Sequence, residues 1–433
     1  MNTKKWIKTT LSVLALATAT KAFALNGMYH IGFGPNAKGV GGAAVAFPQD
    51  TLTALANPAN LVPVGTRADL AVEYLRGSRT AKIRGSTFPF NDVNIDWDLS
   101  RNKNIFLAEA GGSYRFCNDW LAVGLMIAPQ AGGVITWSIP DPFYPAGTEP
   151  FHLDVMYVSI TPTFSAKFFQ NDWIGKHYVG VGVDLTPARM KVSGLQGLRD
   201  QAGFLGGTSD PKHVTNKGWS WTFGWAVRAG YLWEFRPWLS LGVAYRTKTY
   251  MGEFERYKGL ISPHGRADLP ATLYGGISVK PLVQTTIAFD VGRIYNGDVI
   301  AFANPPYDLA KGNNHGASNG AGFGWKSTMV YKVGIAQQIA DSFTIRGGYN
   351  YGQLPWDQDI LGTASGALFL PSTIRHHLTL GATMDLGAQM INAAFTYGFK
   401  HTYKNGNDSL LGGGVTAISS DLVTFEIGFS KVW

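Results

Sequence analysis

The sequence is poor in charged residues and contains a single cysteine. Only 15% of its 433 residues are charged, whereas about a quarter of a typical soluble domain is charged. The lone Cys117 excludes an intramolecular disulfide framework and zinc sites built on several cysteines. Beyond the N-terminal segment, no run is long and apolar enough for a membrane-spanning helix, so a membrane location would require a β-barrel.

Glycine and aromatic residues are abundant in place of charge. The chain has 53 glycines and 13% aromatic residues, a composition typical of many strands with tight bends and with rings at membrane interfaces. The formal net charge is +8, of which four lysines (Lys4, Lys5, Lys8 and Lys21) lie in a segment that we expect to be removed, leaving +4. This charge is too small and too evenly spread to indicate a nucleic-acid partner.

Residues 1–24 have the pattern of a secretory signal peptide. Basic residues at the start precede an uncharged apolar stretch over residues 9–20, and Ala22-Phe23-Ala24 is an A-x-A cleavage site. The apolar stretch is shorter than the roughly 20 residues that a spanning helix needs, which disfavours the alternative of a membrane anchor. We expect the mature chain to begin at Leu25.

Residues 25–63 differ in character from the rest of the chain. They are rich in glycine and small apolar residues, lack a sustained helical or strand period, and contain the turn-forming run Asn57-Pro58-Ala59. A disordered tail would be more polar and more charged. We therefore predict a compact N-terminal plug, or hatch, inside the lumen of a barrel formed by residues 64–433.

From Thr66 onward the dominant pattern has a period of two, as in strands with one lipid-facing and one inward face. Trp219 to Phe235 is the clearest case, with apolar or aromatic residues at every second position. Counting such segments predicts an all-β fold, a transmembrane antiparallel β-barrel of about 14 strands. The predicted strands are 66–84, 104–116, 119–132, 151–169, 177–194, 217–235, 237–255, 268–281, 283–297, 325–339, 342–353, 373–386, 388–403 and 418–433.

The predicted connections alternate between tight turns and long loops. Tight turns fall near Arg236, Leu282, Ala340 and Gly387. Because outer-membrane barrels have short periplasmic turns and long external loops, both termini are expected in the periplasm, and the protein in the bacterial outer membrane. The long loops are predicted at 85–103, 133–150, 195–216, 256–267, 298–324, 354–372 and 404–417.

Several features together resemble the FadL family of outer-membrane transporters for long-chain fatty acids and aromatic hydrocarbons, which includes TodX-like proteins. They are the apolar start Leu25-Asn26, the glycine-rich stretch before Asn57-Pro58-Ala59, Ala128-Pro129 in the third strand, the strand count, and the closing strand Phe425 to Trp433. The resemblance covers essentially the whole mature chain. It implies a monomeric 14-stranded barrel whose ligands are caught by external loops, pass to a pocket at the start of the hatch, and leave through a side opening beside a kinked third strand.

The third predicted strand contains a proline. Pro129 cannot donate a ladder hydrogen bond, so it belongs at a bulge or a break; with Ala128, Gly132 and Gly133 it predicts a kink. Because a closed barrel has no free edge, a local break is where a side opening can form. The alternative is that Pro129 ends the strand at the external rim.

The start of the hatch mixes apolar side chains with flexible glycines, which suits a segment that lines an apolar pocket. The alternative is a filler that only blocks leakage. The predicted pocket residues are Leu25, Asn26, Met28, Tyr29, Ile31 and Phe33. Asn57, Pro58 and Ala59 are predicted to form a structural turn that attaches the hatch to the wall.

Two predicted loops carry apolar residues that are unusual on an exposed surface unless they bind something. The resemblance to the FadL family implies that these loops form the first capture groove. The alternative is that the loops pack against each other. The candidate groove residues are Leu195, Leu198, Phe204, Leu205, Phe254, Tyr257, Leu260 and Ile261.

Arg228 and Arg346 fall on the inward faces of their strands. A buried arginine needs an anionic partner, which is either a ligand carboxylate or an inward acid such as Glu234, Asp290 or Glu426. A fatty acid needs such a cation, whereas an aromatic hydrocarbon does not. The choice between these two ligand classes stays open.

The sequence contains no nucleophile elbow, phosphate loop or HExxH motif. The absence of these motifs does not exclude an enzyme, but an enzyme would leave the plug and the kinked strand without a purpose. We predict no enzymatic activity, no cofactor and no metal site. The predicted function is passive, diffusion-driven uptake of a hydrophobic small molecule by a monomer surrounded by outer-membrane lipid and lipopolysaccharide. The alternative of another class is an outer-membrane enzyme or adhesin that uses the long loops.

Overall fold

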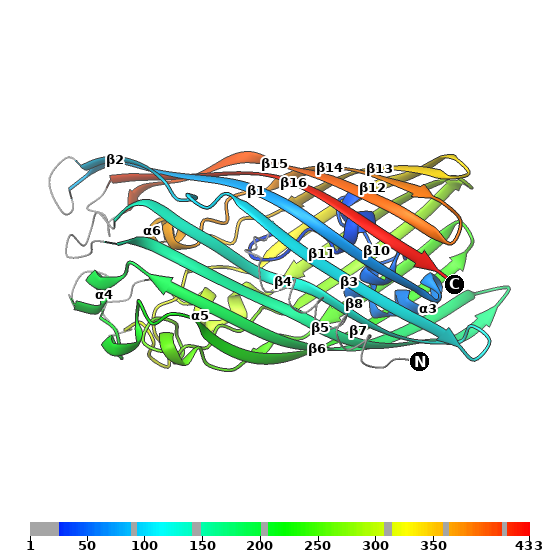
Figure 1. The fold of residues 1–433 in the computed structure, drawn as a ribbon, viewed down its shortest axis with the longest axis horizontal. Coiled ribbons are helices and arrows are strands. Elements are labelled where there is room, and N and C mark those ends of the chain that lie inside the picture. The colour runs from blue at the N-terminus through cyan, green and yellow to red at the C-terminus, as the bar shows by residue number, and fades with distance from the viewer. Residues whose placement is uncertain are drawn as a thin grey trace, which may run out of the picture.

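The computed structural model is a closed antiparallel β-barrel with the N-terminal part of the chain inside it (Figure 1). It describes residues 26–87, 93–140, 149–200, 207–306, 314–357, 363–408 and 414–433. Fourteen strands form the wall, as predicted. The first strand pairs with the last from Arg67 opposite Val432 to Arg84 opposite Val415, which closes the sheet.

Two further short strands, β2 and β9, extend the wall past the ends of neighbouring strands and are not counted among the fourteen. β2 pairs with β1 beyond the residues that β3 occupies, and β9 pairs with β7 beyond β8. The strands are β1 (Arg67–Ser86), β2 (Val93–Asp98), β3 (Asn104–Phe116), β4 (Leu121–Pro140), β5 (Pro150–Asn171), β6 (Gly175–Ser193), β7 (Ser220–Arg236), β8 (Leu239–Arg246), β9 (Tyr250–Met251), β10 (Thr272–Leu282), β11 (Thr285–Ile294), β12 (Thr328–Ala340), β13 (Phe343–Gly352), β14 (His376–Asp385), β15 (Gln389–Asp408) and β16 (Gly414–Val432).

Helices are few and short. In the N-terminal segment they are α2 (Gly34–Gly39), η2 (Thr51–Leu55), η3 (Pro58–Asn60) and α3 (Leu61–Val64). In the connections they are α4 (Gln196–Asp200), η4 (Pro211–His213), η5 (Glu255–Tyr257), η6 (Asn296–Asp298), α5 (Ile300–Ala303) and α6 (Thr363–Phe369). None of these helices has the length and hydropathy of a membrane-spanning helix.

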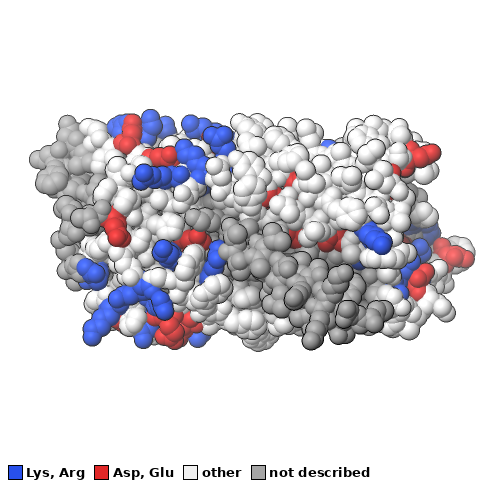
Figure 2. All heavy atoms as spheres, in the orientation of Figure 1, with Lys and Arg blue, Asp and Glu red and all other residues white. Residues whose placement is uncertain are grey.

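The alternating sequence pattern becomes an apolar outer face and a polar or small inner face. On β7, Trp221, Phe223 and Trp225 point outward and are 62%, 54% and 50% exposed, while Ala226 and Arg228, further along the strand on the other face, are buried. In Figure 2, Lys, Arg, Asp and Glu gather toward the ends of the barrel, and the visible surface between the ends is mostly uncharged. This arrangement is that of a lipid-facing band.

Several predicted strand ends are wrong. β4 continues to Pro140 instead of ending at 132, so Pro129 does not end the strand at the rim. β8 ends at Arg246 because the next residues leave the ladder before β9 begins. Within loops predicted at 85–103 and 404–417, the chain instead forms β2 and the outer ends of β15 and β16.

The segment from Asn26 to Val64 lies inside the barrel, and most of its side chains are buried (Figure 1). Its central anchor is Lys38 in α2, whose ammonium lies 2.9 Å from Glu73, 2.9 Å from Glu109 and 3.2 Å from Glu426 on three wall strands. Opposite this cluster, Asp290 of β11 accepts hydrogen bonds from the backbone of Ala44 at 2.8 Å and Val45 at 3.1 Å. The predicted signal peptide and Leu25 lie outside the described residues.

The Asn57-Pro58-Ala59 turn rests against β6 and β7. The Asn57 amide donates to Val45 O at 2.8 Å and to Tyr231 O at 3.0 Å, and its oxygen accepts from Ala59 N at 3.0 Å. The wall has glycines at this contact. A Cβ at Gly230 would lie 2.0 Å from Asn57 Oδ1, and one at Gly180 would lie 2.3 Å from the Pro58 carbonyl carbon. Only glycine allows the turn to approach the wall this closely.

Candidate functional site

An apolar cavity of about 170 Å³ lies between the start of the hatch and the external loops. Its lining includes Met28 from the hatch, Val155 and Tyr157 from β5, and Met190 and Val192 from β6. Among the described residues, no lysine, arginine, aspartate or glutamate lines it. A cavity of this kind is suited to an apolar ligand, because no buried charge has to be compensated.

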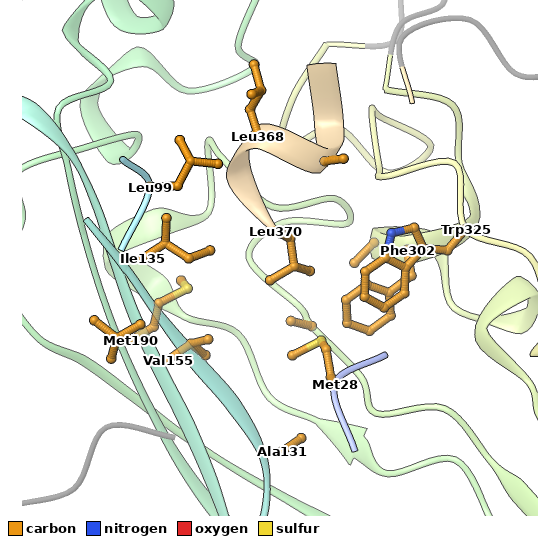
Figure 3. Close-up of a cluster of buried hydrophobic side chains, with 14 of the residues drawn as sticks. Met28, Leu99, Ala131, Ile135, Val155, Met190, Phe302, Trp325, Leu368 and Leu370 are labelled. Carbon is orange, nitrogen blue, oxygen red and sulfur yellow. The ribbon is translucent and has the colours of Figure 1, made fainter. Parts of the chain in front are cut away.

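The loops close the outer side of this cavity. Figure 3 shows Ile135, Val155 and Met190 on one side of a space. Leu370 and Met28 lie on the other side, next to the stacked rings of Phe302 and Trp325. These two rings are 5.1 Å apart at an interplanar angle of 17°. Phe302 belongs to α5, and Leu370 follows α6. Neither helix was predicted from the sequence, although short apolar runs inside predicted loops are the signal that marks them.

The described candidate groove residues are not exposed, which corrects the expectation that they form an open apolar surface. Leu195 and Leu198 are 6% exposed and line the cavity, together with the partly buried Leu260 and Ile261. Phe254 and Tyr257 are fully buried and pack behind it. The Tyr257 hydroxyl donates to Gly218 O at 2.6 Å, and burial raises the pKa of this side chain. Phe204 and Leu205 lie outside the described residues.

The residues predicted for the hatch pocket divide between two cavities. Met28 faces the apolar cavity, while Tyr29, Ile31 and Phe33 line a second cavity of about 60 Å³ below it. Asn26 is buried, and its main chain pairs with that of Tyr29. The second cavity is more polar, since Gln130, Arg228, Arg246 and Lys332 contribute to its lining.

The wall is interrupted between β3 and β4. β4 pairs with β3 only from Leu121 to Ile127, although β3 itself continues toward Asn104 along β1. Within the described residues, β4 next contacts that side of the wall at Thr136, which bridges Ser100. The interruption is filled by apolar side chains, among them Ile105, Leu107 and Val134, which belong to one cluster with Met28.

At the interruption β4 turns into the lumen. All eight residues from Ala128 to Ile135 are buried, so the alternation of inward and outward side chains is lost there. The pairing of β4 with β5 also shifts register between Pro129 and Ala131. Ala131 bridges to Tyr29 of the hatch instead of to β3. The residues predicted for the kink therefore lie where the strand departs from regular geometry.

A chain of polar contacts joins Tyr29 to the same segment of β4. Arg246 donates to Tyr29 Oη at 3.2 Å and to Asp184 Oδ2 at 2.7 Å. Arg228 donates to Asp184 Oδ1 at 2.6 Å and to Gln130 Oε1 at 2.6 Å, and also to the Leu55 carbonyl. Asp184 was not among the site residues predicted from the sequence, because it stands there as a single acid within an apolar strand.

The two candidate arginines have protein partners. Arg228 is held in the internal ion pair with Asp184, which is the alternative to a ligand carboxylate. Arg346 donates to Gln49 Oε1 at 3.1 Å and to Thr383 Oγ1 at 2.7 Å. Neither lines the apolar cavity, although Arg228 lines the second one. Of the acids named with them, Asp290 and Glu426 bind the hatch, and Glu234 contacts Tyr178 and Lys176.

A closed barrel with a lipid-facing band, a filled lumen and an apolar cavity defines an outer-membrane channel protein. The chain belongs to the family described as outer membrane protein transport protein (OMPP1/FadL/TodX), whose model matches residues 11–421. It is therefore an outer-membrane transporter of hydrophobic compounds and not an enzyme. A comparison with curated proteins finds no match.

Solved structures with the same fold include proteins from three bacterial species. A Pseudomonas aeruginosa FadL homologue is 17% identical with a TM-score of 0.65, covering 94% of this chain and 99% of its own. The Pseudomonas putida toluene transporter TodX is 16% identical with a TM-score of 0.64, covering 93% and 99%. The Ralstonia pickettii toluene transporter TbuX is 16% identical with a TM-score of 0.61, covering 93% and 99%. At these identities the comparison shows the fold alone.

Proposed function

We propose that this protein is a passive uptake channel for neutral hydrophobic molecules of about the size of a single ring. The proposal rests on the apolar cavity of about 170 Å³, whose described lining has no lysine, arginine, aspartate or glutamate and includes the polar side chains of Ser262 and His315. An engineered protein cavity of about 150 Å³ with a similar lining binds benzene. A carboxylate placed in such a lining would be buried without a partner, which is strongly unfavourable.

The proposed route begins in the external loops and ends in the lipid. The ligand enters between the loops that carry Leu198 and Leu260, occupies the cavity beside Met28, and leaves through the interruption between β3 and β4. Its support is the single apolar cluster that includes Met28 as well as Ile105 and Leu107 at the interruption. The plug blocks the straight path to the periplasm, so lateral release into the membrane is the remaining exit for an apolar molecule.

Long-chain fatty acids are the second candidate ligand, because cations line the cavity just below. Arg246 and Lys332 contribute to that lining, and Lys332 donates to the Gly42 carbonyl at 3.2 Å. In this case the acyl chain would occupy the apolar cavity and the carboxylate would pass Tyr29 to reach Lys332. Such a ligand needs more room than the apolar cavity has in this structure.

Ligand class is tested by displacement of a fluorescent apolar dye from the purified protein by toluene, oleate or glucose. We expect toluene to displace it, oleate to be weaker, and glucose to have no effect. Ala301→Leu adds methyl groups to the cavity wall and should weaken toluene binding about tenfold. Ala303→Leu, on the same helix but outside the lining, is the matched control. Oleate displacing at lower concentration than toluene, with a loss in Lys332→Met, would favour the second candidate.

The exit is tested by joining the hatch to the kinked strand. Tyr29 and Ala131 form a bridge, and bridge partners are close enough for a disulfide. In a Cys117→Ser background, Tyr29→Cys/Ala131→Cys should lose uptake on oxidation and regain it with reductant, while dye binding persists. Ser100→Cys/Thr136→Cys at the outer end of the interruption is the control pair. Full uptake by the oxidised Tyr29→Cys/Ala131→Cys protein would exclude this exit.

We also infer that the protein acts as a monomer surrounded by outer-membrane lipid and lipopolysaccharide. The wall strands close on themselves through β1 and β16, so in the part of the chain that the structure describes the sheet has no first or last strand free to pair with a second copy. The cavity and the wall interruption both belong to one chain. Cross-linking in native membranes should therefore yield a single-chain species.

A further inference from the structure

Five basic side chains lie on the outward surface of the wall at its external end. They are Arg76, Lys82 and Arg84 on β1 and Lys400 and Lys404 on β15, and all five are exposed; we call them the basic face. Closer to the periplasm, the same side of β1 presents Leu70 and Val72, which are 47% and 46% exposed. The basic face therefore begins where the lipid-facing band ends. Figure 2 shows basic side chains gathered at the upper left, where Figure 1 places the outer ends of β1 and β2.

The strand register creates a shallow site between two of these lysines. Lys82 and Lys404 both lie opposite Ala417 of β16. Because neighbouring strands are about 4.8 Å apart, the two lysine Cα atoms are separated by roughly 10 Å, with only a methyl group between them. The next row toward the membrane has Thr80 and Thr402 opposite Ser419. Two ammonium groups thus stand above a row of hydroxyl groups.

The charge of the basic face is only partly neutralised by the protein. Asp96 contacts Arg84 at 2.5 Å and Lys82 at 3.8 Å, yet these two basic side chains remain 45% and 59% exposed. Among the described side chains, no carboxylate forms a salt bridge with Arg76 or Lys404. Like charges held side by side on a sheet are unfavourable, so an anion from outside would relieve the repulsion.

We propose that the basic face binds the phosphate groups of the glycolipid that forms the outer leaflet of the membrane. The position fits this ligand, because Arg76 stands four residues beyond Val72 on β1, at the external edge of the lipid-facing band, and the head group would meet Lys82 and Lys404 further out. The hydroxyls of Thr80, Ser419 and Thr402 form a polar row that faces the sugar hydroxyl groups, and those of Thr402 and Ser419 are hydrogen-bonded to each other at 2.8 Å. This site is separate from the transport route, since none of its residues lines either cavity.

The test is a titration of the detergent-purified protein with bisphosphorylated lipid A, with bound lipid counted by native mass spectrometry. Each lysine near an anionic lipid surface contributes roughly a fivefold change in affinity. Lys82→Gln/Lys404→Gln should therefore bind about 30-fold more weakly. Lys82→Arg/Lys404→Arg keeps both charges and should bind like the wild type. Lys280→Gln/Lys431→Gln removes two exposed lysines at the opposite end and should have no effect.

Three results would overturn the proposal. They are unchanged lipid A binding by Lys82→Gln/Lys404→Gln, equal binding of dephosphorylated lipid A, and equal competition by phosphatidylglycerol. The last result would mean that any anionic lipid suffices. Heat-dependent mobility of the barrel on gels verifies that each variant is folded. Dye displacement by toluene should be the same in all variants, because the cavity is untouched.

Discussion

Individual polar residues attach the plug to the wall at separate points. Lys38 meets three glutamates on β1, β3 and β16, Asp290 accepts two backbone amides of the plug, and Thr51 donates to Asp69 at 2.6 Å. A buried charge is tolerated only when it is paired, and removing one partner costs much more than the pair contributes. The attachment therefore depends on each partner being present.

Replacing Lys38 with methionine should release the plug. Three buried carboxylates would lose their cation, and the plug should be destabilised by about 3 kcal/mol or more. The measurement is the urea concentration at which added protease begins to cut the N-terminal segment in detergent. Lys431→Met, an exposed lysine near the periplasmic end of β16, is the control. A plug as resistant in Lys38→Met as in the wild type would show that the glutamate cluster does not anchor it.

At the scale of strands and turns, the sequence pattern identified nearly every element of the wall. The reason is physical: a strand between lipid and lumen must alternate, so β7 and β16 can be read from residue types alone. The kink at Pro129 was predicted from its missing amide, but its direction into the lumen was not. That direction depends on Ala131 pairing with Tyr29, a contact between residues about a hundred positions apart.

The apolar cavity could not be predicted in detail for a related reason. Along a strand, the period of two determines whether a side chain points to the lumen or to the lipid. The orientation of a loop side chain depends instead on tertiary packing. Leu198 and Phe254 were therefore identified as candidates, but with the wrong exposure. Asp184 illustrates the same limit, because only the folded barrel brings Arg228 and Arg246 to its two oxygens.

The contact of the Asn57 turn with β7 gives a prediction for a single element. In Gly230→Ala the new Cβ would overlap Asn57 Oδ1, and we expect a loss of about 1–3 kcal/mol from overpacking. Gly275→Ala on β10 is the matched control, because its Cβ would meet nothing nearer than the Gly242 carbonyl at 4.0 Å. Protease sensitivity of the N-terminal segment should rise only in Gly230→Ala, with far-ultraviolet circular dichroism unchanged in both. Equal sensitivity in the two variants would contradict this interpretation of the turn.

The whole molecule consists of two parts with different kinds of stability. The wall is held by ladders of backbone hydrogen bonds that are interrupted locally between β3 and β4, whereas the plug has short helices and is attached mainly through side chains. The part with fewer backbone bonds is expected to open first. We therefore expect the plug to open before the wall unfolds.

In planar lipid bilayers the protein should conduct almost no current until the plug opens. With increasing urea, we expect ion conductance to appear well below the concentration at which circular dichroism detects loss of the strands. Lys38→Met should shift only the conductance onset to lower urea. Simultaneous onset of conductance and strand loss would mean that plug and wall unfold as one unit.

The pairing of β1 with β16 also determines an order of assembly. β1 is synthesised first among the wall strands, yet its partner along that edge is synthesised last. The nascent barrel therefore stays open on one side until export of β16 is complete. Because the plug precedes β1 in the chain, it is synthesised before this seam can form. We therefore expect the barrel to close around the plug as β1 and β16 pair.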